Sequence, residues 1–172
     1  MDKALDDVKI LDLSRVQAGP SCAQLLGFLG ADVIKVEDTN GGDRTRWDLA
    51  HRDDQDSVYF TIYNNNKRAM TLDLKNERGK ELFAQMVEWA DVVLENYSKG
   101  VMDRLGFGYQ RLKKINPRIV YASIKGFGNW GPYSEYKSFE TAAQAMGGLM
   151  AVNGEPDGPP MSVSIGAGDS GT

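Results

Sequence analysis

The sequence has very few of the residues that bind metal ions or form disulfides. It contains one cysteine, Cys22, and one histidine, His51, among 172 residues. A single cysteine excludes an internal disulfide, and one Cys with one His cannot build a zinc site. Since no histidine lies near Cys22 in the sequence, we expect Cys22 to pack rather than to act as a nucleophile. His51 lies in a charged segment, where a solvated side chain is expected. The sequence therefore predicts no metal site.

Long apolar runs and an excess of positive charge are also lacking. No apolar segment approaches the ~20 residues that a membrane-spanning helix needs, and the Asp-rich first seven residues do not resemble a secretory signal. Lys and Arg number 20 against 24 Asp and Glu, which gives a net charge of -4. This balance argues against a general nucleic-acid binder. We expect a cytoplasmic protein with neither a membrane nor a nucleic acid as its partner.

The sequence instead shows a regular alternation of apolar segments and helical patterns. Five short apolar segments are typical of strands: 8–13, 31–37, 68–74, 91–95 and 118–124. Helices are predicted from Pro20 to Leu29, after the capping residue Asn76, and over 101–105, 109–115 and 139–146. Segment 57–63 fits either a strand or a short helix, and 166–172 is expected to be a loop. The alternation predicts an α/β fold with a doubly wound, mostly parallel sheet and right-handed crossovers.

Two helices have apolar positions that indicate a buried face. These positions are Leu25, Leu26, Phe28 and Leu29 in the first helix, and Leu82, Phe83, Met86 and Val87 in the helix after Asn76. The loop at residues 14–20 leaves the first strand at its carboxyl end and opens onto the first helix. Open α/β sheets bind ligands at that edge, and the unpaired N–H groups of a helix N-terminus favour anions.

Individual residues admit both functional and ordinary interpretations. Asp169 has small neighbours that would let a substrate approach a carboxylate, although such glycine-rich stretches are more often plain turns. Gln17 could donate to a carbonyl or carboxylate, although loop glutamines usually face water. Lys75, Arg104 and Lys137 could converge on phosphates or simply be surface residues. The aromatic residues of segment 57–63 are expected to be core. Composition and spacing alone thus indicate an α/β domain with a ligand at the carboxyl edge of its strands.

Several sequence motifs show a more specific resemblance to a known family. LDLSRVQAGPSCAQLLGFLGADVIKVE, GGDRTR, NNNKRAMTLDLK, ADVVLENYSKGVMDRLGFGY, INPRIVYASIKGFGNWGPY, AQAMGGLM and GEPDGPP resemble, in this order, the amino-terminal part of the family III CoA-transferases. The resemblance covers essentially all 172 residues. The VQAGP loop and the final GDS are most similar to members that move CoA from formyl-CoA to oxalate. The resemblance implies a Rossmann-like large domain.

The resemblance also implies a mechanism. The nucleophilic aspartate of the family falls on Asp169, which would attack the thioester carbon of an acyl-CoA to form an aspartyl–acyl anhydride. A carboxylic acid would then take the activated position and leave as a new CoA thioester. Gln17 would hold acyl or carboxylate oxygens, and Glu140 and Tyr59 match positions that line the reaction pocket. The positions that match contacts to coenzyme A are Gln17, Ala18, Leu72, Asp73, Leu74, Lys75, Asn96, Tyr97, Ser98, Arg104 and Lys137.

Two positions depart from the family pattern. The arginine expected after the VIKVE strand is Asp38 here, so one phosphate contact is lost or reversed in sign. The histidine or small residue often found before the Val-Gln pair is Arg15. Either change is expected to shift CoA affinity or acyl preference.

Family members extend beyond the length of this chain into more of the sheet and a small domain, and their subunits form interlocked homodimers. We therefore expect residues 1–172 to be the amino-terminal part of the large domain, with a truncated, inactive CoA-binding remnant as the alternative function. An acyl-CoA racemase is disfavoured because Phe139 stands where racemases place a histidine base. A dinucleotide-binding oxidoreductase domain fits the coarse fold but lacks GxGxxG after the first strand.

Overall fold

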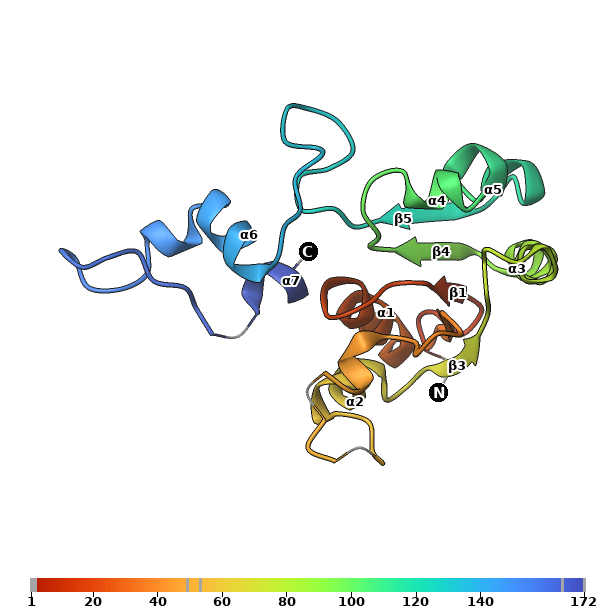
Figure 1. Cartoon of the computed structure of the whole chain (residues 1–172), viewed down its shortest axis with the longest axis horizontal. Coiled ribbons are helices and arrows are strands. Elements are labelled where there is room, and N and C mark those ends of the chain that lie inside the picture. Colours follow the sequence, from red (N-terminus) through yellow and green to blue (C-terminus); the bar gives the residue numbers. More distant parts are fainter. Residues whose placement is uncertain (1–2, 49, 53, 165, 172) are drawn as a thin grey trace.

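A five-stranded parallel sheet forms the centre of the computed structural model, which describes residues 3–48, 50–52, 54–164 and 166–171 (Figure 1). The strand order is β3-β2-β1-β4-β5, and every neighbouring pair is parallel. The strands are β1 (Lys9–Asp12), β2 (Asp32–Glu37), β3 (Arg68–Thr71), β4 (Val92–Glu95) and β5 (Val120–Ser123). The predicted doubly wound parallel sheet is confirmed, with the first strand of the chain at its centre.

Helices connect the strands and extend the chain beyond the last one. They are α1 (Ala18–Phe28), α2 (Val58–Asn64), α3 (Glu77–Trp89), α4 (Val101–Arg104), α5 (Tyr109–Ile115), α6 (Glu140–Met146) and α7 (Ala167–Ser170), with 3-10 turns η1 (Arg44–Arg46) and η2 (Leu149–Ala151). The ambiguous segment 57–63 is helical because the Ser57 hydroxyl accepts from the N–H of Phe60 at 2.9 Å and so caps α2. The predicted strand 68–74 ends at Thr71, where a turn begins in which the Asp73 carboxylate accepts from the N–H of Lys75.

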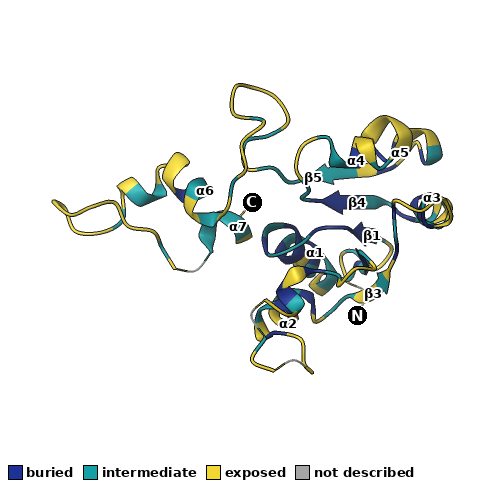
Figure 2. Ribbon diagram, in the orientation of Figure 1, coloured by how far each residue is buried: buried dark blue, intermediate teal, exposed yellow. Residues whose placement is uncertain are grey.

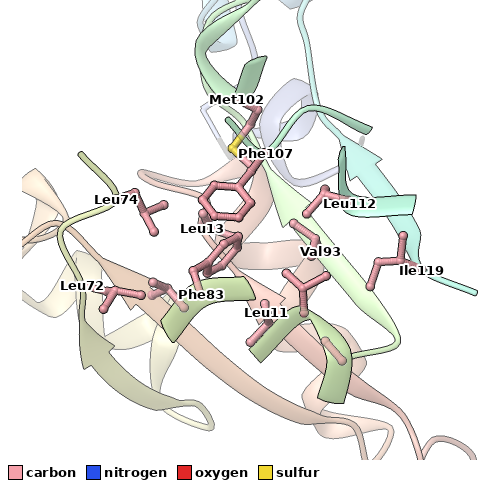
Figure 3. Packing of buried hydrophobic residues seen from close by; sticks show 13 residues of the cluster. Leu11, Leu13, Leu72, Leu74, Phe83, Val93, Met102, Phe107, Leu112 and Ile119 are labelled. Carbon is pink, nitrogen blue, oxygen red and sulfur yellow. The ribbon is translucent and has the colours of Figure 1, made fainter. Parts of the chain in front are cut away.

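The two faces of the sheet carry separate hydrophobic clusters, because successive strand residues point to opposite sides. On one face, Leu11 packs in a cluster with Phe83 of α3 and Leu112 of α5. Figure 3 shows the ring of Phe83 beneath that of Phe107, and the ring centroids lie 4.7 Å apart in an edge-to-face arrangement. On the other face, Ile10 packs in a second cluster with Ala23 of α1. Helices on both faces cover the sheet, as a doubly wound fold requires. Figure 2 shows that the central strands β1 and β4 are mostly buried.

Helix α1 exposes most of the apolar positions that the sequence suggests are buried. Leu26 packs on the sheet, but Leu25, Phe28 and Leu29 are 57%, 56% and 51% exposed. Their spacing places these three on one face of the helix, opposite the face of Ala23 and Leu26 that contacts the sheet. The expectation of one buried apolar set is therefore wrong for α1. It holds for α3, where Phe83 and Val87 are fully buried and Leu82 and Met86 pack against the same cluster.

Helix α3 begins at the predicted capping residue. The Asn76 side chain accepts from the N–H of Arg78 at 2.9 Å. We expect Asn76→Ala to lower the free energy of unfolding by about 1 kcal/mol, because an N–H group of the first turn loses its acceptor. Denaturant unfolding measures this loss, with Gln85→Ala, on an exposed site of the same helix, as the control. Equal stabilities of the two variants would contradict the capping role.

Candidate functional site

A buried ionic cluster positions the loop that leaves β1. The Lys35 ammonium donates to the carbonyl oxygen of Ser14 at 2.9 Å and lies 3.2 Å from the carboxylate of Asp43. Both charged side chains are almost fully buried, at 1% and 0% exposed. Asp43 also accepts from the N–H of Val16 at 3.1 Å. Val16 has a φ of 68°, a left-handed conformation that is strained in a β-branched residue, and this hydrogen bond helps to hold it there.

The ends of β1 and β4 are joined through a side-chain amide. The Asn96 oxygen accepts from the N–H of Arg15 at 2.8 Å, and the Asn96 nitrogen donates to the Arg15 carbonyl at 2.7 Å. The Arg15 guanidinium lies 5.2 Å from the centroid of the Tyr97 ring and 3.9 Å from the Asp38 carboxylate. The predicted carboxyl edge thus brings together residues from two loops that are about eighty positions apart in the sequence.

A cavity of about 370 Å³ lies at this edge, and its wall includes residues of the loops after β1 and β4 and of helices α6 and α7. Residues predicted to bind coenzyme A or to react contribute to its wall. They are Gln17, Ala18, Asn96, Tyr97, Ser98, Lys137 and Asp169. The wall also contains an aromatic and cationic segment, residues 124–128 and 134–139. The cavity is large enough for part of a cofactor-sized ligand.

Glu140 holds the short helix that carries Asp169. Its carboxylate accepts from the N–H groups of Gly168 at 2.8 Å and Asp169 at 2.6 Å. Gln144, one turn further along α6, donates both to the Glu140 carboxylate and to the Val163 carbonyl. Sequence analysis expects a loop here, but residues 167–170 form α7, because the Glu140 carboxylate caps the first turn from outside the segment.

Gln17 joins α7, the helix that carries Asp169, to α2 through a chain of hydrogen bonds. The Tyr59 hydroxyl donates to Gln17 Oε1 at 2.6 Å, and Gln17 Nε2 donates to the hydroxyl of Ser170 at 2.7 Å. Sequence reasoning missed Ser170 and Gly166, although both lie in the GAGDSG motif around Asp169. A Cβ at Gly166 would clash with Gln17 Nε2 unless that side chain moved, and the residue has a φ of 63°, a left-handed conformation that favours glycine.

The pKa values of Asp169 and Glu140 are shifted in opposite directions by their surroundings. Burial, followed by the charge of Glu140, raises the pKa of Asp169 above its ordinary value. Burial acts to raise the pKa of Glu140 as well, but hydrogen bonds from Gln144 and from two backbone N–H groups outweigh it, and its pKa is lowered. Burial and nearby acidic groups raise the pKa of Tyr59 to about 12, so its hydroxyl keeps its proton at neutral pH. Asp169 is thus the more basic of the two carboxylates.

Replacing Glu140 with glutamine is expected to lower the pKa of Asp169, because the neighbouring negative charge is removed while the burial of Asp169 remains. The Asp169 pKa should therefore fall without reaching its ordinary value. NMR titration of the Asp169 carboxyl carbon measures the change, with Glu155→Gln in an exposed turn as the control. An unchanged or higher pKa in Glu140→Gln would show that the two groups do not interact.

Other predicted residues lie outside the cavity wall. Leu72 and Leu74 are buried in the larger hydrophobic cluster, and Asp73 forms the turn after β3. Lys75 and Arg104 are exposed and do not line the cavity, so of the three cations that could converge on phosphates only Lys137 lines it. Their contacts to coenzyme A remain predictions.

Cys22 packs as expected, but of the three aromatic residues of α2 that were expected to be core only Phe60 is buried. Cys22 packs against the second hydrophobic cluster, that of Ile10 and Ala23, and burial raises the pKa of its thiol. His51 is exposed. Phe60 is buried, whereas Tyr59 and Tyr63 are only partly so, with ring centroids 5.2 Å apart.

Sequence analysis did not predict another buried ion pair at the carboxyl edge of the strands. The Glu95 carboxylate, at the end of β4, accepts from Lys125 at 2.7 Å and from the Tyr121 hydroxyl at 2.8 Å. The pair is 1% and 11% exposed, and Lys125 lines the cavity. The only available signal was the position of both residues at or just after the carboxyl ends of strands.

Within the described residues, no cluster of three potential metal-binding side chains occurs. In the same part of the chain, no helix has the length and apolar character needed to cross a membrane.

Comparison with known proteins identifies the family. The model of CoA-transferase family III matches residues 5–172. The chain is 52% identical over its whole length to a formyl-CoA:oxalate CoA-transferase of Streptomyces avermitilis, of which it covers 42%, and 50% identical to one of Rhodopseudomonas palustris, of which it covers 40%. A crystal structure of a CAIB/BAIF family protein from Brucella suis superposes with a TM-score of 0.90 at 41% identity, over 96% of this chain and 45% of that one. The chain spans about two fifths of the length of these curated relatives, and it belongs to CoA-transferase family III.

Proposed function

We propose that this chain carries the nucleophile and part of the nucleotide-binding surface of an enzyme that moves CoA from a formyl-CoA-like thioester to an oxalate-like carboxylic acid. The observation that carries the proposal is the position of Asp169: it lines the cavity, its N–H is bound by Glu140, and the adjacent Ser170 is bound by Gln17. The names of the curated relatives support the choice of substrates.

The first step forms an anhydride. An Asp169 carboxylate oxygen attacks the thioester carbon, the C–S bond breaks, and the CoA thiolate leaves with the electron pair. The raised pKa makes Asp169 a stronger base than an ordinary carboxylate and therefore a better nucleophile. Glu140 keeps its own charge and positions the attacking residue through the backbone of α7. Such positioning contributes to the rate because the nucleophile no longer has to be ordered in the transition state.

The second stage transfers CoA to the acceptor. The acceptor carboxylate attacks the aspartyl carbonyl of the anhydride and displaces the donor acid, which leaves as its carboxylate. The CoA thiolate then attacks the acceptor acyl carbon, which forms the new thioester and restores the Asp169 carboxylate. With substrate bound, the Gln17 amide would donate to the oxygens that gain negative charge in these steps, in place of the Ser170 hydroxyl and the Gly166 carbonyl to which it now donates. Tyr59 fixes the orientation of that amide.

Trapping the anhydride tests the proposal. We expect the chain, incubated with formyl-CoA and hydroxylamine, to release CoA and to acquire a hydroxamate on the peptide that contains Asp169, detected by mass spectrometry. Samples without formyl-CoA provide the control. If the chain binds CoA in calorimetry but no hydroxamate forms, the alternative of an inactive CoA-binding remnant is favoured. A hydroxamate on another acidic residue would exclude Asp169 as the nucleophile.

A further inference from the structure

The cationic side chains around the cavity differ in how closely each is paired with an acidic side chain. Among the described residues, the cationic side chains that line it are Arg15, Lys99, Lys125 and Lys137. Lys125 lies 2.7 Å from the buried Glu95, and Lys99 lies 2.7 Å from Glu135. Arg15 faces Asp38 at 3.9 Å, close to the limit of an ion pair, and both side chains are partly exposed. An ion pair of this kind contributes little stability, so its arginine can exchange partners readily.

The backbone of Arg15 is rigid although its side chain is at the surface. Asn96 binds both the N–H and the carbonyl of Arg15, at 2.8 and 2.7 Å. The residues on either side are bound by the buried Lys35–Asp43 pair. The Arg15 Cα is therefore fixed at the wall of the cavity, and only the side-chain torsions remain to be ordered when a ligand binds. The face of the Tyr97 ring, 5.2 Å away, supports the planar guanidinium.

We propose that Arg15 binds a phosphate group of the CoA nucleotide and that Asp38 holds the guanidinium in place until the ligand arrives; this inference rests on the proposed function. A guanidinium binds phosphate through two parallel N–H donors. The Asp38 carboxylate, at 3.9 Å from Arg15, does not use these donors fully. The phosphate displaces Asp38 from Arg15, and Arg15 determines affinity for the nucleotide half of the substrate. Asp38 competes with the phosphate for the same cation.

Calorimetry of the 172-residue chain with CoA tests this assignment. We expect Arg15→Gln to weaken CoA binding about tenfold, the effect of losing one charge-assisted contact. Arg15→Lys should retain part of the affinity, because it keeps the charge but not the paired donors. Asp38→Asn should tighten binding severalfold, since the competing carboxylate is removed. Arg44→Gln is the matched control, because Arg44 is an exposed arginine paired with Asp48 and lies outside the cavity wall.

Dephospho-CoA identifies the phosphate involved. If the loss in Arg15→Gln persists with dephospho-CoA, Arg15 binds the diphosphate, and if it disappears, Arg15 binds the 3′-phosphate. The affinity of Arg15→Gln should also depend less on salt concentration than that of the unsubstituted chain.

Different results of these measurements would overturn the role of Arg15 and the proposed function. CoA binding that Arg15→Gln leaves unchanged would overturn the role of Arg15 while leaving the proposed function intact. Weaker binding in Asp38→Asn would overturn the competition by Asp38. No CoA binding by the unsubstituted chain would overturn the binding function and, with it, the role of Arg15.

Discussion

Replacing Lys35 with methionine is expected to lower the free energy of unfolding by about 3–5 kcal/mol, the usual cost of leaving one partner of a buried ion pair uncompensated. Lys35 and Asp43 are 1% and 0% exposed, so the carboxylate left behind has no access to water. Burial already acts to raise the pKa of Asp43, and Lys35 with the Thr45 hydrogen bonds reverses this and lowers it. Without Lys35, Asp43 must either take up a proton or remain charged and buried without its cationic partner.

Two controls separate this effect from the loss of a surface charge. Arg68→Met breaks the shorter ion pair between Arg68 and Asp32, at 2.6 Å, but both side chains are exposed, so a loss below about 1 kcal/mol is expected. The double variant Lys35→Met with Asp43→Leu removes both charges and should recover part of the stability. Denaturant unfolding at pH 7 measures all three. Equal losses in Lys35→Met and Arg68→Met would contradict the buried-pair argument.

The same substitution is expected to affect the site. Lys35 binds the Ser14 carbonyl and Asp43 binds the N–H of Val16, so the loop that carries Arg15 and Gln17 depends on the pair. CoA affinity measured on the folded fraction of Lys35→Met should therefore decrease as well, whereas Arg68→Met should leave it unchanged.

Asp169→Asn is expected to abolish hydroxylamine trapping and to reduce CoA transfer at least ~1000-fold, as loss of a covalent nucleophile generally does. The amide has no carboxylate oxygen to form the anhydride, while the backbone N–H that Glu140 binds is kept. CoA binding should therefore remain within a fewfold of that of the unsubstituted chain. Asp157→Asn, in an exposed turn, is the matched control and should trap normally. Normal turnover of Asp169→Asn would overturn the covalent mechanism.

The stability of Asp169→Asn provides a second readout. Because burial raises the pKa of Asp169 in the folded state, the folded chain holds this proton to higher pH than the unfolded chain. The contribution of Asp169 to stability is therefore lost as pH rises from its ordinary pKa through its raised one. Asp169→Asn should be more stable than the unsubstituted chain at pH 7, and this advantage should shrink as the pH is lowered through that range. Urea unfolding at several pH values tests the trend.

Much of the fold could be predicted because it depends on local patterns. Short apolar segments predicted the five strands, and Asn76 predicted the start of α3. The buried face of α1 was predicted incorrectly, since Leu25, Phe28 and Leu29 are apolar yet exposed, and periodicity shows that residues share a face but not which face meets the sheet. For segment 57–63, the decisive feature was the Ser57 cap.

The candidate site also has features that the sequence predicts and features that it does not. The sequence by itself determined the strand–helix alternation, the carboxyl edge where a ligand would bind, and the resemblance that singled out Asp169 and Gln17. Only the tertiary structure decided that Glu140 caps α7 and that Lys35 is buried against Asp43. It also decided that Arg15 and Asp38, the two departures from the family pattern, face each other. The physical reason is that strand and helix patterns arise from neighbouring residues, whereas these contacts join segments that come together only when the sheet has assembled.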